Sequence, residues 1–241
     1  MVTREAMEGL KHHALSRYPE EACGVQVKGA FVPVPNIAPD PCRDFRMPPE
    51  VWLDGPIEAV LHSHTDPHAF RAKAGCHPWC PTAADMRGQS QTGVTWAIAV
   101  TDGVQVGEPF WWDESLLDTP ILERPFRHGV LDCYSAIRAW YWQTRGVILR
   151  DFPRSDAWWD EGGDLYREGY PEAGFRSLQG QETVDVGDVL LARIRSPVPN
   201  HAAVYIGQGR IYHHLFGRLS RREPLARYRD KFITDYLRYD P

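Results

Sequence analysis

The stretch LDCYSAIRAWYW, residues 131–142, is the most informative part of the chain because it predicts a helix with Cys133 in its first turn. Free N–H groups and the helix dipole at such a position favour a thiolate, so we expect the pKa of Cys133 to be lowered. A cysteine nucleophile also needs a histidine base, and that base needs a group to orient it. The stretch therefore directs attention to the histidines that follow.

Two histidines lie near the ends of predicted strands in the last fifth of the chain. His201 stands at the entry to NHAAVYIG, residues 200–207, and His213 follows a Gly-x-Gly turn in RIYHH, residues 210–214. If these strands pair as a hairpin, His201 and His213 lie close enough for one to orient the other.

This set of motifs resembles the NlpC-type papain-like cysteine peptidases over about residues 115–241. The resemblance rests on Asp-Cys before a helix, on Gly-Asp at 187–188, and on the two histidine motifs. It implies cleavage of peptide stems in the bacterial cell wall, typically between D-glutamate and diaminopimelate. It makes Cys133 the nucleophile, His201 the base and His213 the third polar residue. The alternative is a buried cysteine with two structural histidines, as in inactivated relatives.

Two neighbouring histidines are left open as alternatives to these assignments. His214 is the next candidate for the third polar residue if the register is shifted by one. His128 precedes the cysteine closely and is a candidate substrate contact.

The first half of the chain carries a second constellation, His62-Ser63-His64 at the end of a predicted strand. Residues two apart in a strand point to the same face, so both histidines can bind one ion. A carboxylate from the helix that follows, Asp85, completes a His/His/Asp set and leaves a fourth position for water. A nearby carboxylate must still move the proton of that water, and Glu21 is the candidate.

These residues resemble the JAMM/MPN+ metallopeptidases. The resemblance rests on PEEACG at 19–24, on the HSH motif, and on Thr82 three residues before Asp85. It implies an isopeptidase-like site that holds Zn²⁺ through His62, His64 and Asp85. Glu21 then serves as the general acid/base, and Thr82 replaces the family's usual serine, which helps to stabilise the oxyanion.

The sequence departs from that family in the segment between the second histidine and the aspartate. Thr65 stands where a proline usually follows, and the gap to Asp85 is longer than the family spacing. The inserted segment carries Cys76 and Cys80, which, with Cys42 or a histidine, offer a second structural metal site or an iron–sulfur cluster. The alternative is a surface lid with free thiols. Cys23 is most simply a buried small apolar residue.

Length and composition predict a globular protein of two α+β domains. The 241 residues are 43% apolar, and either half is large enough for its own core. We expect a JAMM/MPN-like domain at 1–114, followed by a papain-like NlpC-type domain at 115–241. The predicted helices cover 3–17, 131–142 and a start at 82–88. The predicted strands cover 22–34, 57–62, 94–100, a segment from 104, and three runs that begin at 188, 202 and 210, with mostly loop at 152–174.

Charge and hydropathy argue against two classes of partner. The net charge is −5, and no Lys/Arg run marks a nucleic-acid surface. No apolar run approaches the ~20 residues that span a bilayer. An odd count of five cysteines without a signal peptide argues against a disulfide framework and predicts folding in a cytoplasm.

The order of the two domains resembles a family of tail-tip proteins from lambda-like bacteriophages. This implies assembly in the host cytoplasm, a place at the virion tail tip, and partners among the tail hub and distal tail proteins. Three functions stay open. The first is a peptidoglycan endopeptidase that acts during entry. The second is an assembly protease that uses the zinc site, and the third is a structural tail-tip subunit with one or both sites inactive.

Overall fold

A computed structural model describes residues 1–53 and 55–241. The chain divides into two compact units, Met1–Glu114 and Ser115–Pro241, and each unit has its own sheet. Both units combine helices with a sheet, which confirms the prediction of mixed α+β structure. No helix in the described ranges is long and apolar enough to cross a membrane.

The N-terminal unit is built on a five-stranded sheet with the order β2-β1-β3-β4-β5. Strands β3 and β4 run parallel, and the other neighbouring pairs are antiparallel. The predicted strand region at 22–34 forms a hairpin, which turns at Lys28-Gly29. The strands are β1 (Cys23–Val27), β2 (Ala30–Val34), β3 (Ala59–Thr65), β4 (Thr95–Thr101) and β5 (Phe110–Trp112).

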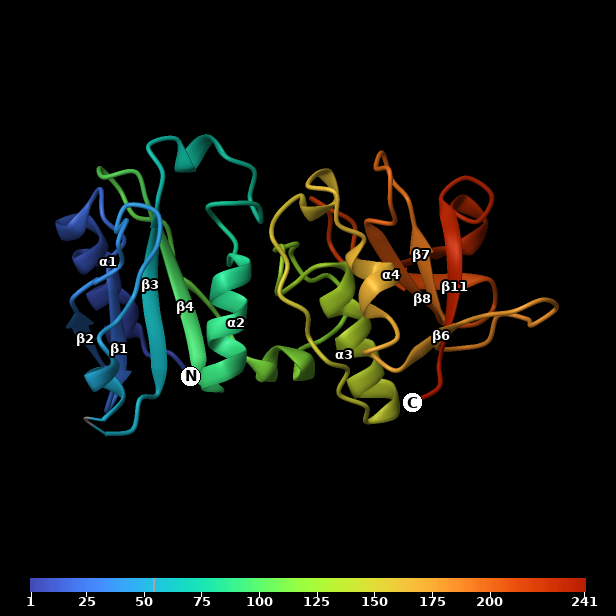
Figure 1. Ribbon diagram of the computed structural model, residues 1–241, viewed down its shortest axis with the longest axis horizontal. Coiled ribbons are helices and arrows are strands. Elements are labelled where there is room, and N and C mark those ends of the chain that lie inside the picture. Colours follow the sequence, from blue (N-terminus) through green and yellow to red (C-terminus); the bar gives the residue numbers. More distant parts are fainter. Residues whose placement is uncertain (54) are drawn as a thin grey trace. The chain divides into compact units, whose positions relative to one another are not determined.

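Helix α1 (Arg4–Arg17) covers one face of this sheet (Figure 1). Thr3 caps it by accepting a hydrogen bond from the backbone N–H of Ala6, as a threonine at an N-cap does. Its buried residues, Ala6, Leu10 and Ala14, face the sheet. Leu15 of the same helix is turned outward and is 40% exposed.

Helix α2 (Ala83–Thr92) lies on the opposite face of the sheet (Figure 1). Alternation along β3 turns Ala59 and Leu61 toward α1, and therefore turns His62 and His64 toward the α2 side. The helix approaches the sheet closely, since a Cβ on Gly88 would lie 2.3 Å from the Trp96 ring. The fold thus brings the start of α2 to the two histidines.

The strand predicted from Val104 is much shorter than expected. Regular pairing with β4 is confined to β5, and Val106 adds one isolated bridge to Thr101. Val104 itself is 87% exposed. Pro109 cannot donate a ladder hydrogen bond, which is consistent with regular pairing that begins only at Phe110.

The C-terminal unit holds a six-stranded antiparallel sheet with the order β10-β9-β8-β7-β11-β6. The predicted hairpin is present as β8 and β9, while β6, β10 and β11 were not predicted. The strands are β6 (Phe175–Ser177), β7 (Val189–Ala192), β8 (His201–Tyr205), β9 (Arg210–His213), β10 (Arg221–Pro224) and β11 (Ile233–Tyr239).

Helix α3 (Cys133–Arg145) packs on this sheet (Figure 1). Its buried residues Ile137, Trp140 and Tyr141 share a core with Val204 and Tyr212 of the sheet. The helix begins at Cys133, two residues after the predicted start at Leu131, so Cys133 lies in its first turn as predicted, with Asp132 as the N-cap.

Short helices interrupt the connections of both units. The predicted loop at 152–174 contains η4 (Trp158–Asp160) and the five-residue α4 (Leu165–Gly169), which is too short to show helical periodicity in the sequence. The remaining 3-10 helices are η1 (Pro49–Trp52), η2 (Ala69–Arg71), η3 (Glu114–Asp118) and η5 (Leu225–Arg227).

Candidate functional site

The N-terminal unit brings His62, His64 and Asp85 together in a buried cluster. Asp85 Oδ1 lies 3.2 Å from His62 Nε2, and Asp85 Oδ2 lies 3.3 Å from His64 Nε2. The two Nε2 atoms are 3.3 Å apart. Three groups that usually carry lone pairs therefore converge at one point, and their approach requires a shared proton or a cation between them.

Each member of this cluster is oriented by a neighbour. His64 Nδ1 lies 2.8 Å from the carbonyl oxygen of Pro78, which belongs to the inserted segment. Because a carbonyl only accepts, Nδ1 carries the proton and Nε2 of a neutral His64 has the lone pair that a metal needs. Phe45 stacks on the ring of His62, and Ser63, between the histidines, accepts a hydrogen bond from the N–H of Ala22.

Thr82 and Asp85 form a capping box at the start of α2. The Thr82 hydroxyl and its backbone N–H each lie 2.7 Å from Asp85 Oδ2 and donate to it. Thr82 thus holds the carboxylate in place, and its hydroxyl is already engaged with Asp85.

Glu21 is buried beside this cluster, just before β1. Burial raises the pKa of Glu21 to about 7, although the nearby His64 acts against burial. Burial also lowers the pKa of His64, but the hydrogen bond with Asp85 outweighs it and raises the pKa to about 9. A carboxyl group with a pKa near neutrality can take up and release a proton at physiological pH.

The cluster satisfies the donor requirements of a zinc site. Its ligand atoms lie within 4.8 Å of one another, and two imidazoles with one carboxylate are a zinc ligand set. Within residues 1–53 and 55–241 it is the single group of three or more potential ligands. The alternative of a second metal site or an iron–sulfur cluster at Cys76 and Cys80 has no such ligand group among the described residues. Cys23, Cys42 and Cys133 are free thiols, and Cys23 is buried as predicted.

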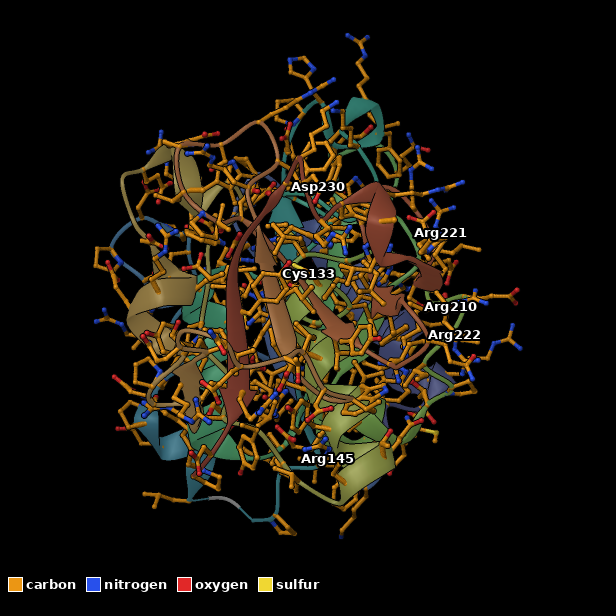
Figure 2. The ribbon with its side chains drawn as sticks, turned by 90° about the vertical axis from the view of Figure 1, so that its right-hand side faces the viewer. Cys133, Arg145, Arg210, Arg221, Arg222 and Asp230 are labelled. Atoms are coloured by element: carbon orange, nitrogen blue, oxygen red, sulfur yellow. The ribbon has the colours of Figure 1, made fainter. Side chains whose placement is uncertain are left out.

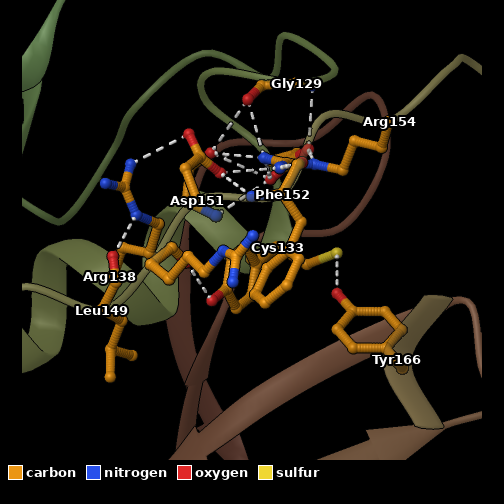
Figure 3. A network of polar contacts seen from close by, with 12 residues as sticks. Gly129, Cys133, Arg138, Leu149, Asp151, Phe152, Arg154 and Tyr166 are labelled. Carbon is orange, nitrogen blue, oxygen red and sulfur yellow. Dashed lines mark hydrogen bonds and ion pairs between the residues drawn. The ribbon is translucent and has the colours of Figure 1, made fainter. Parts of the chain in front are cut away.

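In the C-terminal unit, Cys133 is the first residue of α3, and its thiol has two hydrogen-bond partners, of which Figure 3 shows Tyr166. The sulfur lies 3.0 Å from the Tyr166 hydroxyl of α4. The backbone N–H of Ala202 donates a second hydrogen bond to it. Since Ala202 directly follows His201, the start of β8 adjoins the nucleophile.

The expected lowering of the Cys133 pKa is wrong. Burial raises the pKa of the thiol to about 11, and the carboxylate of Asp132 adds to this. The hydrogen bond from Tyr166 acts in the opposite direction but is too weak to prevail. Burial and the nearby His213 hold the pKa of His201 well below its usual range. The two groups are therefore a neutral thiol and a neutral imidazole rather than a preformed ion pair.

The predicted pair of histidines forms a chain that ends on an acid. His201 Nε2 lies 3.1 Å from His213 Nδ1, and His213 Nε2 lies 3.2 Å from Glu223 Oε2 of β10. His214 lies elsewhere, with its Nε2 3.1 Å from the carbonyl oxygen of Arg218. The structure thus brings His213, and not His214, to His201.

A buried ionic network fixes the start of α3 (Figure 3). Arg154 donates from Nε to Asp132 Oδ2 at 2.8 Å and from Nη2 to Asp132 Oδ1 at 3.0 Å. It also donates to the carbonyl oxygen of Gly129 and to Asp151. Arg138 of α3 reaches the second oxygen of Asp151 at 3.0 Å. The loop before α3, the helix and the loop after it are therefore joined behind the nucleophile.

His128 lies in the loop held by this network and is buried. A hydrogen bond joins it to the backbone of Ser155, and burial lowers its pKa. Its Nε2 has no hydrogen-bond partner among the described residues.

The comparisons with known proteins agree with these motifs. The NlpC/P60 family model matches residues 123–238. Tail tip assembly protein K of Escherichia phage lambda is 36% identical over 191 residues, 77% of this chain and 84% of that protein. The chain belongs to the tail tip assembly protein K family. The family resemblance predicted from the sequence is thereby confirmed, and the C-terminal unit has the NlpC/P60 papain-like fold.

The chain is also similar to two other proteins. Tail tip assembly protein K of Escherichia phage N15 is 26% identical over 253 residues, which cover 98% of this chain and 95% of that protein. A crystal structure of an NlpC/P60 family protein from Bacillus cereus covers 95% of this chain, at 15% identity and a TM-score of 0.32. The match spans 66% of that protein's own length.

Several residues of the C-terminal site were not anticipated from the sequence. Tyr166 and Glu223 come from short elements that carry no periodic signal. Asp132 was visible in the Asp-Cys motif, but its partner Arg154 comes from an irregular loop. The N-cap position of Asp132 was the one signal available for any of them.

Proposed function

We propose that this protein is a tail-tip cysteine peptidase that hydrolyses the peptide stems of peptidoglycan during phage entry. The observation that carries the proposal is the hydrogen-bonded chain of His201, His213 and Glu223 on the sheet against which α3, the helix that begins at Cys133, packs. Family membership and the NlpC/P60 match support a peptidase of this class.

In the proposed reaction His201 removes the thiol proton as Cys133 attacks the carbonyl carbon of a stem peptide bond. The tetrahedral intermediate collapses, the C–N bond breaks, and the departing amine takes the proton from His201. Water then hydrolyses the thioester and releases the acid. The backbone N–H of Cys133 at the helix start and the Tyr166 hydroxyl, 3.0 Å from the sulfur, are the candidate donors to the oxyanion.

Digestion of purified peptidoglycan by the wild type, with released fragments identified by mass spectrometry, tests this proposal. Cys133→Ala should release no cleaved stems, while Cys42→Ala, which removes an exposed cysteine of the N-terminal unit, should match the wild type. Equal release by Cys133→Ala and wild type would exclude the cysteine mechanism.

We also propose that the N-terminal unit contains a JAMM-like zinc site, with His62, His64 and Asp85 as ligands. The convergence of the three donors supports this second function. A bound zinc ion lowers the pKa of its water and polarises a carbonyl group. Glu21 exchanges a proton with the reacting groups in this scheme, and Thr82 orients Asp85 through its hydroxyl. An isopeptidase-like cleavage is the chemistry that such a site supports.

Metal analysis of the purified protein tests the site without reference to activity. We expect one zinc ion per chain in the wild type and almost none in His64→Ala. His68→Ala, which changes an exposed histidine of the inserted segment, is the matched control. Equal zinc content in His64→Ala and wild type would contradict the assignment.

The names of the relatives, which are tail tip assembly proteins, support a proposal about where this protein acts. We propose assembly in the host cytoplasm, a final position at the virion tail tip, and contacts with tail hub and distal tail proteins. If tails of Cys133→Ala phage assemble but enter poorly, the peptidase acts in entry. If His64→Ala blocks maturation of a tail protein, the zinc unit is an assembly protease. If phages with either variant assemble and infect normally, the remaining hypothesis is a structural tail-tip subunit whose sites are inactive.

A further inference from the structure

Three side chains on neighbouring strands of the C-terminal sheet form a continuous chain of hydrogen bonds. His213 lies opposite Ala203 of β8 and opposite Arg221 of β10. Because side chains two apart share a face, His201, His213 and Glu223 all project from the same side of the sheet. The register of three strands thus accounts for the two contacts of 3.1 and 3.2 Å.

The carboxylate at the end of this chain is firmly held. Glu223 is 5% exposed, and Arg221 Nη2 lies 2.8 Å from its Oε1. The Tyr228 hydroxyl donates to Oε2, the oxygen that also faces His213. Burial acts to raise the pKa of Glu223, but Tyr228, His213 and the arginines outweigh it and lower the pKa. Glu223 is therefore ionised at neutral pH and can only accept hydrogen bonds.

The direction of every hydrogen bond in the chain follows from this charge. Glu223 accepts, so His213 Nε2 must carry a proton and donate it. Burial lowers the pKa of His213 to about 4, so the ring is neutral and its Nδ1 has the lone pair. His201 Nε2 must then donate to that Nδ1, which leaves the lone pair of His201 on Nδ1.

We infer that Glu223 is a positioning residue of the cysteine-peptidase site, which sets the tautomers of His213 and His201 so that His201 Nδ1 is the proton acceptor. The predicted effect on catalysis rests on the proposed peptidase function. The tautomers themselves do not depend on it. Without the carboxylate, the opposite arrangement of protons becomes available to both rings, and a base with its proton on the wrong nitrogen cannot deprotonate the thiol.

Glu223→Gln tests the inference, because glutamine keeps the shape but offers an N–H₂ group that can donate to His213. Arg222→Gln is the matched control, since Arg222 is an exposed residue of the same strand and lies near Arg210 at the margin of the unit (Figure 2). Two readouts are needed. One is the histidine tautomers, from ¹H–¹⁵N NMR of ring-labelled protein, and the other is kcat and KM on a peptidoglycan stem peptide.

For the wild type and Arg222→Gln we expect the Nε2-protonated tautomer at both His201 and His213. For Glu223→Gln we expect a mixture at both rings and a kcat at least about tenfold lower, with KM little changed. Unaltered tautomers in Glu223→Gln would overturn the inference, and so would a wild-type His213 protonated on Nδ1. If Glu223→Gln does not fold, the wild-type spectrum alone still shows which nitrogen of His213 carries the proton. A wild type that fails to cut stem peptides, but shows the expected tautomers and their loss in Glu223→Gln, would refute the peptidase proposal and leave the positioning inference standing.

Discussion

Replacement of Arg154 by leucine is expected to destabilise the C-terminal unit strongly. Arg154 is 6% exposed and donates two hydrogen bonds to the carboxylate of Asp132, which is itself 2% exposed. Removal of the guanidinium leaves Asp132 buried with its charge but without its counterion. The remaining donors to Asp132 are the N–H groups of Gly129 and Ser135 and the Ser135 hydroxyl.

The expected magnitude follows from that uncompensated charge. Loss of one partner from a buried ion pair costs about 3–5 kcal/mol of unfolding free energy. With a urea dependence of about 2 kcal/mol per M, the unfolding midpoint should fall by about 2 M. Asp132→Asn in the Arg154→Leu background should recover part of this loss, because asparagine keeps the N-cap and removes the charge.

The assay must report on the C-terminal unit alone, since two units need not unfold together. Hydrogen exchange of peptides from α3, measured by mass spectrometry across a urea series, meets this need. Arg150→Leu is the control, because Arg150 and Glu172 form an exposed ion pair, which contributes about 0–1 kcal/mol. A midpoint shift for Arg154→Leu no larger than that of Arg150→Leu would refute the reasoning.

Three further predictions concern the two sites. Tyr166→Phe removes the hydrogen bond that lowers the pKa of the Cys133 thiol, so iodoacetamide should alkylate Cys133 more slowly at pH 8 than in the wild type; equal rates would contradict this. Thr82→Ala should lower the stability of the N-terminal unit by about 1 kcal/mol and weaken zinc binding about tenfold, whereas Thr82→Ser should preserve both in urea unfolding and zinc titration. His213 has a folded-state pKa of about 4, below its unfolded value, so the folded state binds fewer protons. Above about pH 6.5, His213 is neutral in both states and leaves the free energy of unfolding unchanged. As the pH falls toward 4, the unfolded state binds a proton that the folded state does not, and the free energy of unfolding falls by about 3 kcal/mol. His213→Asn should therefore show a shallower acid dependence in urea unfolding, and identical slopes would argue against this assignment.

Local sequence patterns were sufficient where a residue lies at the end of a regular element. Cys133 begins a helix, His201 begins a strand, and His213 ends the paired strand, so strand pairing alone brings the two histidines together. The same holds for His62 and His64, whose spacing of two in β3 places them on one face.

The sequence could not reveal contacts made by short elements or irregular loops. Tyr166 reaches the thiol from a five-residue helix, and Glu223 reaches His213 only because β10 pairs with β9. The carbonyl of Pro78 that orients His64 belongs to the inserted segment, which looked like a departure from the family pattern. These contacts depend on tertiary placement, which periodicity does not encode.

The thiol pKa shows how tertiary structure can reverse a local expectation. The helix start at Cys133 favours a thiolate, as the sequence suggested. Packing against β8 adds burial, and the N-cap Asp132 adds a negative charge beside the sulfur, so the pKa of the thiol rises instead. Proton transfer to His201 is therefore part of the reaction we propose, rather than a step completed beforehand.

In the proposed mechanism, Cys133 forms a covalent intermediate with a cell-wall stem peptide. Intact-protein mass spectrometry of the full chain, acid-quenched during turnover of a synthetic stem peptide, tests this most directly. We predict an adduct equal to the acyl part of the substrate, mapped to the peptide that contains Cys133 and absent from Cys133→Ala. Cleavage of the stem peptide by Cys133→Ala at the wild-type rate, with no adduct on either protein, would contradict the account.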